Sequence, residues 1–250
     1  MVFRPVHAAE QNAAKPRPTA VDLRIRKAVI LDLDGVVADR QPIDEIAWAK
    51  LLVEQGRAQA GLNLDFLYAG HPRRAVLKQD LGAVSESDSE RLARRKNELY
   101  AEAAAQLKPK PRISDVVRRL NKDGTICALA TSANSGRTYK TLAKIARRKD
   151  SAAIVTREEA GRPKPAPDIF LLTAAIIDAE TEYCVVVEDP VAGVPAARAA
   201  GMKCVGWAAV KRFGELAEAG AHDLISELST GYFNVLLHAS DEATAAGERV

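Results

Sequence analysis

The sequence predicts an α/β fold built on a parallel β-sheet, and three observations support this. Short, almost wholly apolar runs recur along the chain, and stretches with helical periodicity separate them. Strands that are apolar throughout are typical of parallel sheets, which helices cover on both faces. Polar or acidic residues directly follow several of these runs. Because ligands bind at the carboxyl ends of such strands, we expect a site at one edge of the sheet.

The expected elements alternate along the chain. The strands cover residues 28–32, 126–131, 153–155, 184–188, 203–207 and, more weakly, 223–225. Helices are expected at residues 114–122, 136–147, 167–178 and 193–200. Residues 40–108 break this alternation, because they show helical patterns only, at 44–55, 62–67, 72–81 and 87–107. The spacings of Ser85 with Asp88 and of Ser87 with Glu90 are capping-box patterns for the last of these helices.

The domain organisation follows from this break. We expect a core formed by residues 27–39 and 110–239, with a helical cap inserted at residues 40–109. Residues 1–26 are rich in Ala, Pro and Arg and have no apolar signal-peptide core, which favours a disordered extension over a transit peptide. Residues 240–250 are small and polar, and we expect a mobile tail there.

The composition indicates which kinds of molecule this protein is expected to bind. A hydrophobic content of 47% and a charged content of 28% are typical of a packed soluble core. The net charge of +3 and the 5% of aromatic residues do not indicate nucleic-acid or membrane partners. Three cysteines, in a spacing that matches no metal motif, indicate buried, reduced thiols. We therefore expect a cytoplasmic monomer that acts on a small molecule.

The most informative segment is DLDGVVADR, residues 32–40, which follows the first apolar run. Asp32 and Asp34 lie two residues apart at a strand end, so their side chains point toward the same side. Two carboxylates in one cleft are stable only if a cation or a proton neutralises them, and Mg²⁺ suits oxygen ligands near phosphate. Taken alone, the segment also fits an ordinary Asp-Gly turn.

Three further motifs follow in order. ALATSANSG, residues 128–136, places hydroxyl groups at a strand-to-helix junction, which suits phosphate but also an ordinary helix N-cap. GRPKPAPDIF, residues 161–170, holds Lys164 in a backbone stiffened by prolines. VVVEDPVAGVPAARAAG, residues 185–201, delivers Glu188 and Asp189 to a strand end, where a cation must offset their repulsion.

The four motifs in this order resemble those of the haloacid dehalogenase superfamily, and in particular its β-phosphoglucomutase-like branch of phosphatases and phosphomutases with a helical cap. The resemblance implies a Rossmann-like core with the cap inserted after the first motif. It also implies that Asp32 is the nucleophile, that Asp34 is the general acid and base, and that Mg²⁺ is the cofactor. Its implied ligands are Asp32, the backbone carbonyl of Asp34, and Asp189, with Glu188 adjacent. The implied phosphate-binding residues are Thr131, Ser132 and Lys164.

The cap resembles the same branch at two positions. AGHPRRAVL, residues 69–77, is similar to its specificity loop and implies that Arg73 lies over the cleft. RRKNELY, residues 94–100, is similar to a cap helix whose lysine, here Lys96, faces the substrate. Related mutases carry a histidine where this chain has Asp44.

The differences between this sequence and the related mutases decide whether a phosphatase or a phosphomutase is expected. Related mutases also bind a second phosphate with polar residues around positions 133–135, where this chain has Ala133 and Asn134. If Asp44 faces the cleft, its charge would repel a second phosphate. The sequence thus favours a Mg²⁺-dependent phosphatase of a small phosphorylated metabolite, such as a sugar phosphate or phosphoglycolate. A phosphomutase is the alternative, and an inactive binding or regulatory module is a third that the intact motifs disfavour.

Overall fold

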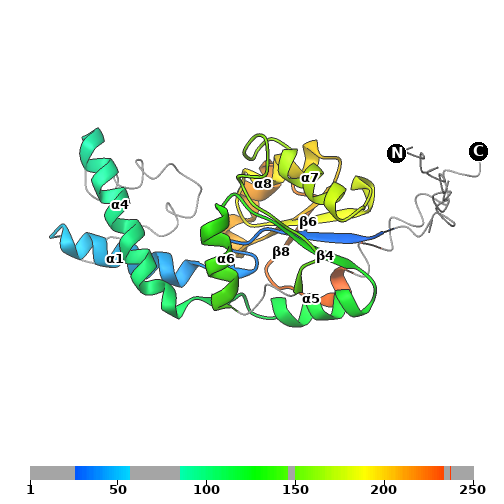
Figure 1. Cartoon of the computed structure of the whole chain (residues 1–250), viewed down its shortest axis with the longest axis horizontal. Helices are drawn as coiled ribbons and strands as arrows, with labels where there is room; N and C mark the ends of the chain where they lie inside the picture. Colours follow the sequence, from blue (N-terminus) through cyan, green and yellow to red (C-terminus); the bar gives the residue numbers. More distant parts are fainter. Residues whose placement is uncertain (1–25, 57–84, 146–149, 234–236, 238–250) are drawn as a thin grey trace, which may run out of the picture.

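The fold was analysed in a computed structural model, which describes residues 26–56, 85–145, 150–233 and 237. Its core is a parallel six-stranded sheet in the order β5-β4-β1-β6-β7-β8 (Figure 1). The strands are β1 (Ala28–Leu31), β4 (Ile126–Ala130), β5 (Ile154–Val155), β6 (Cys184–Glu188), β7 (Lys203–Trp207) and β8 (Asp223–Ile225). All six predicted strands are present, and the predicted α/β fold is confirmed.

Two apolar layers sandwich the sheet, because successive side chains of a strand point to opposite faces. Val29 and Leu31 of β1 pack in one cluster with residues of α5 (Ile113–Lys122) and α6 (Ser135–Lys144). Ala28 and Ile30 pack in the other cluster, with residues of α7 (Asp168–Ile176), α8 (Gly193–Ala199) and α9 (Phe213–Glu218). Figure 1 shows α7 and α8 on one side of the sheet and α5 on the other. Both faces are thus buried, as the continuous apolar runs predict.

The predicted core helices are present to within a few residues, but two helical segments were not predicted, α9 and one that includes residues 230–233. The six-residue helix α9 was not predicted, because the segment is short and contains Gly214, which lowers helix propensity. Among the described residues, 3₁₀ turns cover Ala104–Gln106, Thr181–Tyr183 and Val210–Arg212.

Two long helices lie in the segment predicted as the cap, α1 (Gln41–Glu54) and α4 (Glu86–Ala103), and they pack against each other (Figure 1). Helix α1 begins three residues earlier than predicted, since Pro42 lies in its first turn, where its missing N–H costs no hydrogen bond. Ser85 caps α4 by accepting the Asp88 N–H at 3.1 Å, which matches the first of the two capping-box patterns. The helices expected at 62–67 and 72–81 lie outside the described residues.

The chain passes between the core and the predicted cap twice, and the two connecting segments pair with each other. Strand β2 (Ala38–Asp39) forms an antiparallel ladder with β3 (Lys108–Pro109). The sequence did not predict this ladder, because two-residue strands carry no periodic pattern. The ladder joins the two ends of the insertion and fixes where the cap leaves the core.

The remaining predictions on composition concern the cysteines and membrane segments. Cys127, Cys184 and Cys204 are buried and form no disulfide, as expected. No helix in the described part of the chain is long and apolar enough to cross a membrane. The predicted extension at residues 1–26 and tail at 240–250 fall almost wholly outside the described residues.

Candidate active site

The site is built around Asp32, the residue that directly follows the central strand β1. The Asp32 N–H donates to the Val187 carbonyl of β6 at 3.0 Å, so the backbone remains sheet-bound at this point. The Asp34 N–H donates to Asp32 Oδ2 at 3.0 Å. Asp32 is 3% exposed. Its carboxylate is therefore buried and oriented by its own loop.

Lys164 is the cation that faces this carboxylate. Its Nζ donates to Asp32 Oδ1 at 2.8 Å, to Glu188 Oε1 at 2.6 Å and to the Ala130 carbonyl at 3.2 Å. An ammonium has three donors, and here all three have acceptors. The Nζ also lies 5.0 Å from the centre of the Phe170 ring. The proline-rich third motif thus brings a fully hydrogen-bonded ammonium to the ends of β1, β4 and β6.

Burial dominates the electrostatics of this group. It raises the pKa of Asp32, and it raises the pKa of Glu188 to about 8, with Lys164 partly offsetting both shifts. Burial also raises the pKa of Asp189, and Arg212 opposes this. One ammonium faces two carboxylates, so the buried trio carries a net negative charge when both acids are ionised. A proton or a further cation would neutralise it.

Two glycines leave room for the carboxylates of Asp189 and Glu188, which lie directly against the glycine backbone. Gly35 has φ +90°, and a Cβ built there would lie 2.2 Å from Asp189 Oδ2. A Cβ at Gly193 would lie 2.1 Å from the Glu188 carboxyl carbon. Both glycines lie within the predicted motifs, and close approach of a neighbouring acid explains why a side chain is not accommodated at either position.

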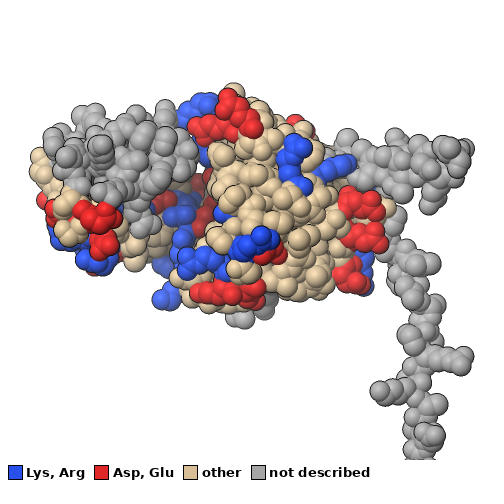
Figure 2. Space-filling model, turned by 90° about the horizontal axis from the view of Figure 1, so that it is seen from above, with Lys and Arg blue, Asp and Glu red and all other residues tan. Residues whose placement is uncertain are grey.

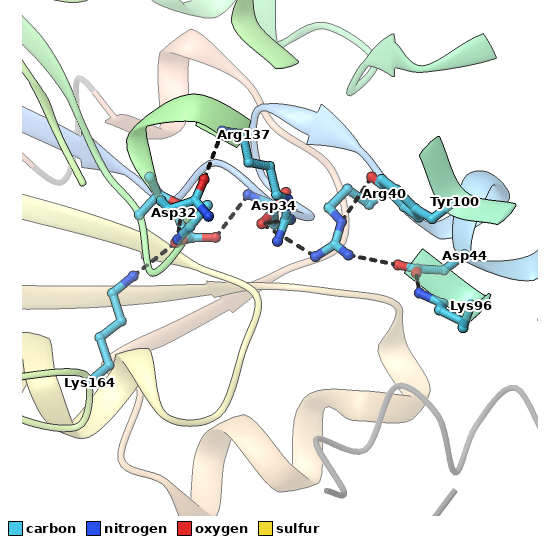
Figure 3. Close-up of polar contacts among 11 residues, drawn as sticks. Asp32, Asp34, Arg40, Asp44, Lys96, Tyr100, Arg137 and Lys164 are labelled. Atoms are coloured by element: carbon cyan, nitrogen blue, oxygen red, sulfur yellow. Dashed lines mark hydrogen bonds and ion pairs between the residues drawn. The ribbon is translucent and has the colours of Figure 1, made fainter. Parts of the chain in front are cut away.

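A row of alternating charges runs from the core to the cap (Figure 3). Asp34 Oδ2 lies 3.3 Å from Arg40 Nη1, and Arg40 Nη2 lies 3.2 Å from Asp44 Oδ2. Asp44 also pairs with Lys96 of α4. Arg40 Nε donates to the Tyr100 hydroxyl at 3.1 Å. The first motif is therefore connected to both cap helices by ion pairs.

Three arginines of the site were not predicted as functional residues. Arg137 pairs with Asp34, and Arg212 pairs with Asp189. Arg40 and Arg137 lie at or just beyond the ends of the first and second motifs, so their sequence positions could have indicated them. Arg212 lies in no motif, and only the folding of the chain after β7 brings it to Asp189.

The other predicted phosphate-binding residues lie at the end of β4, beside β1. Thr131 is buried, and its hydroxyl accepts the Ala133 N–H at 3.1 Å. Ser132 is exposed. Lys164 contacts Asp32, and Thr131 and Ser132 directly follow β4, the strand that pairs with β1. Their role in binding phosphate remains a prediction.

The arrangement of the acidic side chains indicates whether the site could hold Mg²⁺. In the described part of the chain, no three His, Cys, Asp or Glu side chains form a ready-made metal cluster, and Lys164 and Arg212 contact the acids. However, Glu188 Oε2 is buried and has no hydrogen-bond partner. An orphaned carboxylate oxygen and an excess of negative charge suit a hard cation. The residues present therefore fit Mg²⁺.

Of the predicted cap residues, Arg73 lies outside the described residues. Lys96 is buried, and its Nζ lies 5.7 Å from the centre of the Trp48 ring and 5.1 Å from that of Tyr100. Asp44 is not an isolated negative charge, because Arg40 and Lys96 pair with it. The argument that Asp44 repels a second phosphate is thereby weakened.

Replacing Lys96 tests its structural role. We expect Lys96→Ala to lower the free energy of unfolding by about 1–3 kcal/mol, because the partly buried Asp44 carboxylate loses one of its two cations. Urea unfolding measures the change. The matched control is Arg94→Ala on the exposed face of the same helix, which should shift stability by less than about 0.5 kcal/mol. Equal effects of both variants would contradict the prediction.

Comparisons with known proteins agree with the fold and the site. The model of the haloacid dehalogenase-like hydrolase family matches residues 26–201. The chain belongs to this family. It is therefore an enzyme of the haloacid dehalogenase-like phosphatase type, as the four motifs predicted.

Individual relatives show where in the family the chain lies. It is 33% identical over 189 residues to a β-phosphoglucomutase of Bacillus subtilis, covering 72% of this chain and 82% of the relative. It is 32% identical to hexitol phosphatase A of Escherichia coli, covering 70% and 80%. A haloacid dehalogenase-like protein from Agrobacterium tumefaciens has a similar structure, with a TM-score of 0.72 at 26% identity, covering 86% of this chain and 99% of that one.

Proposed function

We propose that this chain is a Mg²⁺-dependent phosphatase that hydrolyses the phosphomonoester of a small metabolite, such as a sugar phosphate or phosphoglycolate. The observation that carries the proposal is the buried Asp32 carboxylate, oriented by the Asp34 N–H and faced by Lys164. An oriented carboxylate beside a fixed ammonium suits nucleophilic attack on a phosphoryl group whose charge the ammonium offsets. Relatives named hexitol phosphatase A and fructose-1-phosphate phosphatase support this class of substrate.

In the proposed reaction, an oxygen of Asp32 attacks phosphorus and the ester oxygen departs with the bonding pair. Asp34 donates a proton to that oxygen and then accepts one from the water that hydrolyses the aspartyl-phosphate. Asp34 Oδ2 contacts Arg40 and Arg137, whereas Oδ1 has no partner, so Oδ1 is the atom suited to transfer the proton. Lys164 holds the transferring oxygens.

Mg²⁺ is the proposed cofactor. Asp32, the backbone carbonyl of Asp34, and Asp189 would hold it, with Glu188 adjacent. When bound, the ion would supply positive charge that offsets the acids and the phosphoryl oxygens. Arg212 now contacts Asp189, so we infer that it yields part of this contact when the metal binds.

Removal of metal should therefore change both activity and stability. We expect phosphatase activity to fall to background after exhaustive EDTA treatment and to return with Mg²⁺. The melting temperature should rise with Mg²⁺, because an ion that binds only the folded state stabilises it. Calorimetry of the same preparation with and without Mg²⁺ measures the shift. Full activity in EDTA would refute the site as described.

A phosphomutase is the second candidate, and the identity to a β-phosphoglucomutase together with the compensated charge of Asp44 favours it. Phosphorus NMR of the protein with Mg²⁺ and a hexose 1-phosphate separates the two functions. We expect free inorganic phosphate to accumulate. Conversion to the hexose 6-phosphate with little free phosphate would instead establish the mutase.

A further inference from the structure

Basic side chains pair with the acids of the candidate active site. Figure 2 shows Lys, Arg, Asp and Glu side chains next to one another at the notch between the two lobes of the molecule. Lys164 faces Asp32 and Glu188, whereas Asp189 is paired with a different cation, Arg212. The reaction proposed above gives Arg212 neither a proton to transfer nor a phosphoryl oxygen to hold.

Arg212 binds two atoms of Asp189. Its Nη1 pairs with Asp189 Oδ1, and its Nη2 donates to the backbone carbonyl of the same residue at 3.1 Å. The other carboxylate oxygen, Oδ2, lies against the backbone at Gly35, in the loop that carries Asp32 and Asp34. The guanidinium therefore holds Oδ1 and leaves Oδ2 beside the loop of the first motif.

A second carboxylate lies beside the same guanidinium. Glu215, in the first turn of α9, has its Oε2 3.6 Å from Arg212 Nε, which is an ion pair but too long for a hydrogen bond. Both of these atoms are buried, and neither has a hydrogen-bond partner within the described residues. Because buried polar atoms are rarely left unpaired, this contact is one that Arg212 does not complete while it holds Asp189.

A magnesium ion bound to Asp189 would lie close to the positive charge of Arg212. Their repulsion would be strong, because the Arg212 side chain is 13% exposed and little water screens it. The Asp189 side chain is 27% exposed, so an ion from solvent can reach it. A small shift of the guanidinium toward Glu215 would relieve the repulsion and pair both orphaned atoms.

We propose that Arg212 is an internal counter-ion that moves between two carboxylates. It neutralises Asp189 until Mg²⁺ binds, and it then completes its contact with Glu215. Arg212 thereby weakens Mg²⁺ binding and stabilises the metal-free protein, whereas Glu215 strengthens Mg²⁺ binding because it accepts the displaced charge. Arg212 acts through Asp189, so it is a positioning residue and not a catalytic one. This inference rests on the proposed function only in placing Mg²⁺ at Asp189.

Calorimetric titration with MgCl₂ tests the inference on the full chain, stripped of metal and without substrate. The dissociation constant of Mg²⁺ is measured for wild type, Arg212→Gln, Glu215→Gln and the double variant. The control for the glutamate is Glu218→Gln, at an exposed position at the end of the same helix. The control for the arginine is Arg119→Gln, which breaks an exposed pair with Asp123.

We expect Arg212→Gln to tighten Mg²⁺ binding about tenfold, which is the scale of one hydrogen bond between charged groups. Glu215→Gln should weaken it about threefold, since the Glu215 side chain is 38% exposed. The double variant should bind much as Arg212→Gln does, because without the guanidinium Glu215 has no displaced charge to accept. Both controls should bind Mg²⁺ as wild type does.

The opposite signs of the two single variants make the test decisive. Weaker Mg²⁺ binding by Arg212→Gln would overturn the inference, because Arg212 would then only orient Asp189 for the metal. An effect of Glu215→Gln that is the same with and without Arg212 would also overturn it. If Arg212→Gln fails to fold, Glu215→Gln still decides, since wild-type affinity in that variant would refute the exchange.

Stability and turnover complete the test. Without Mg²⁺, Arg212→Gln should melt below wild type, and saturating Mg²⁺ should narrow the difference. A wild-type chain that binds no Mg²⁺ would refute both the inference and the proposed cofactor. A chain that shows the expected affinity changes but releases no phosphate would defeat only the proposed function. A phosphatase whose variants all bind Mg²⁺ equally would overturn only this inference.

Discussion

Asp32→Asn is expected to abolish turnover while the fold persists. An amide is a poor nucleophile and a poor metal ligand, so the rate of phosphate release should fall by at least about 10³-fold. The amide can still accept the Asp34 N–H, which keeps the loop in place. Steady-state phosphate release measures the loss, and circular dichroism checks the fold.

The control is Asp115→Asn on α5, which alters an exposed carboxylate that pairs with Arg118 across one helical turn, and it should leave turnover unchanged. Asp34→Asn should also reduce turnover strongly, but with a good leaving group the aspartyl-phosphate should accumulate, since attack no longer requires the acid. Turnover by a clean preparation of Asp32→Asn would show that another residue is the nucleophile.

Of the substitutions proposed, Lys164→Met should lower the free energy of unfolding the most. The Lys164 and Asp32 side chains are 4% and 5% exposed, and that of Glu188 is fully buried. Removing the ammonium leaves two buried carboxylates facing each other, and breaking such a group costs about 3–5 kcal/mol. Urea unfolding in EDTA measures the loss. Mg²⁺ should restore part of it, because a divalent cation can offset the same charges.

Two further variants make this prediction specific. Lys122→Met, at an exposed position of α5, should change stability by less than about 0.5 kcal/mol. Adding Glu188→Gln to Lys164→Met should recover stability, since one of the two repelling charges is removed. If Lys164→Met and Lys122→Met unfold at the same urea concentration, the buried trio does not contribute to stability as described.

The features of this protein that depend on local sequence patterns could be predicted from the sequence. Continuous apolar runs that alternate with helical stretches are typical of a parallel sheet covered on both faces, so the runs of β1, β4 and β6 predicted the core directly. The motifs follow these runs at once, and parallel strands end at the same edge. The convergence of Asp32, Thr131 and Glu188 could therefore be predicted without coordinates.

Tertiary structure alone decided how the charges are paired. The partner of a charged side chain depends on residues distant in sequence, as with Arg212 and Asp189 or Lys96 and Asp44. Asp44 seemed to oppose a second phosphate when considered by itself, and only its two cations show that its charge is compensated.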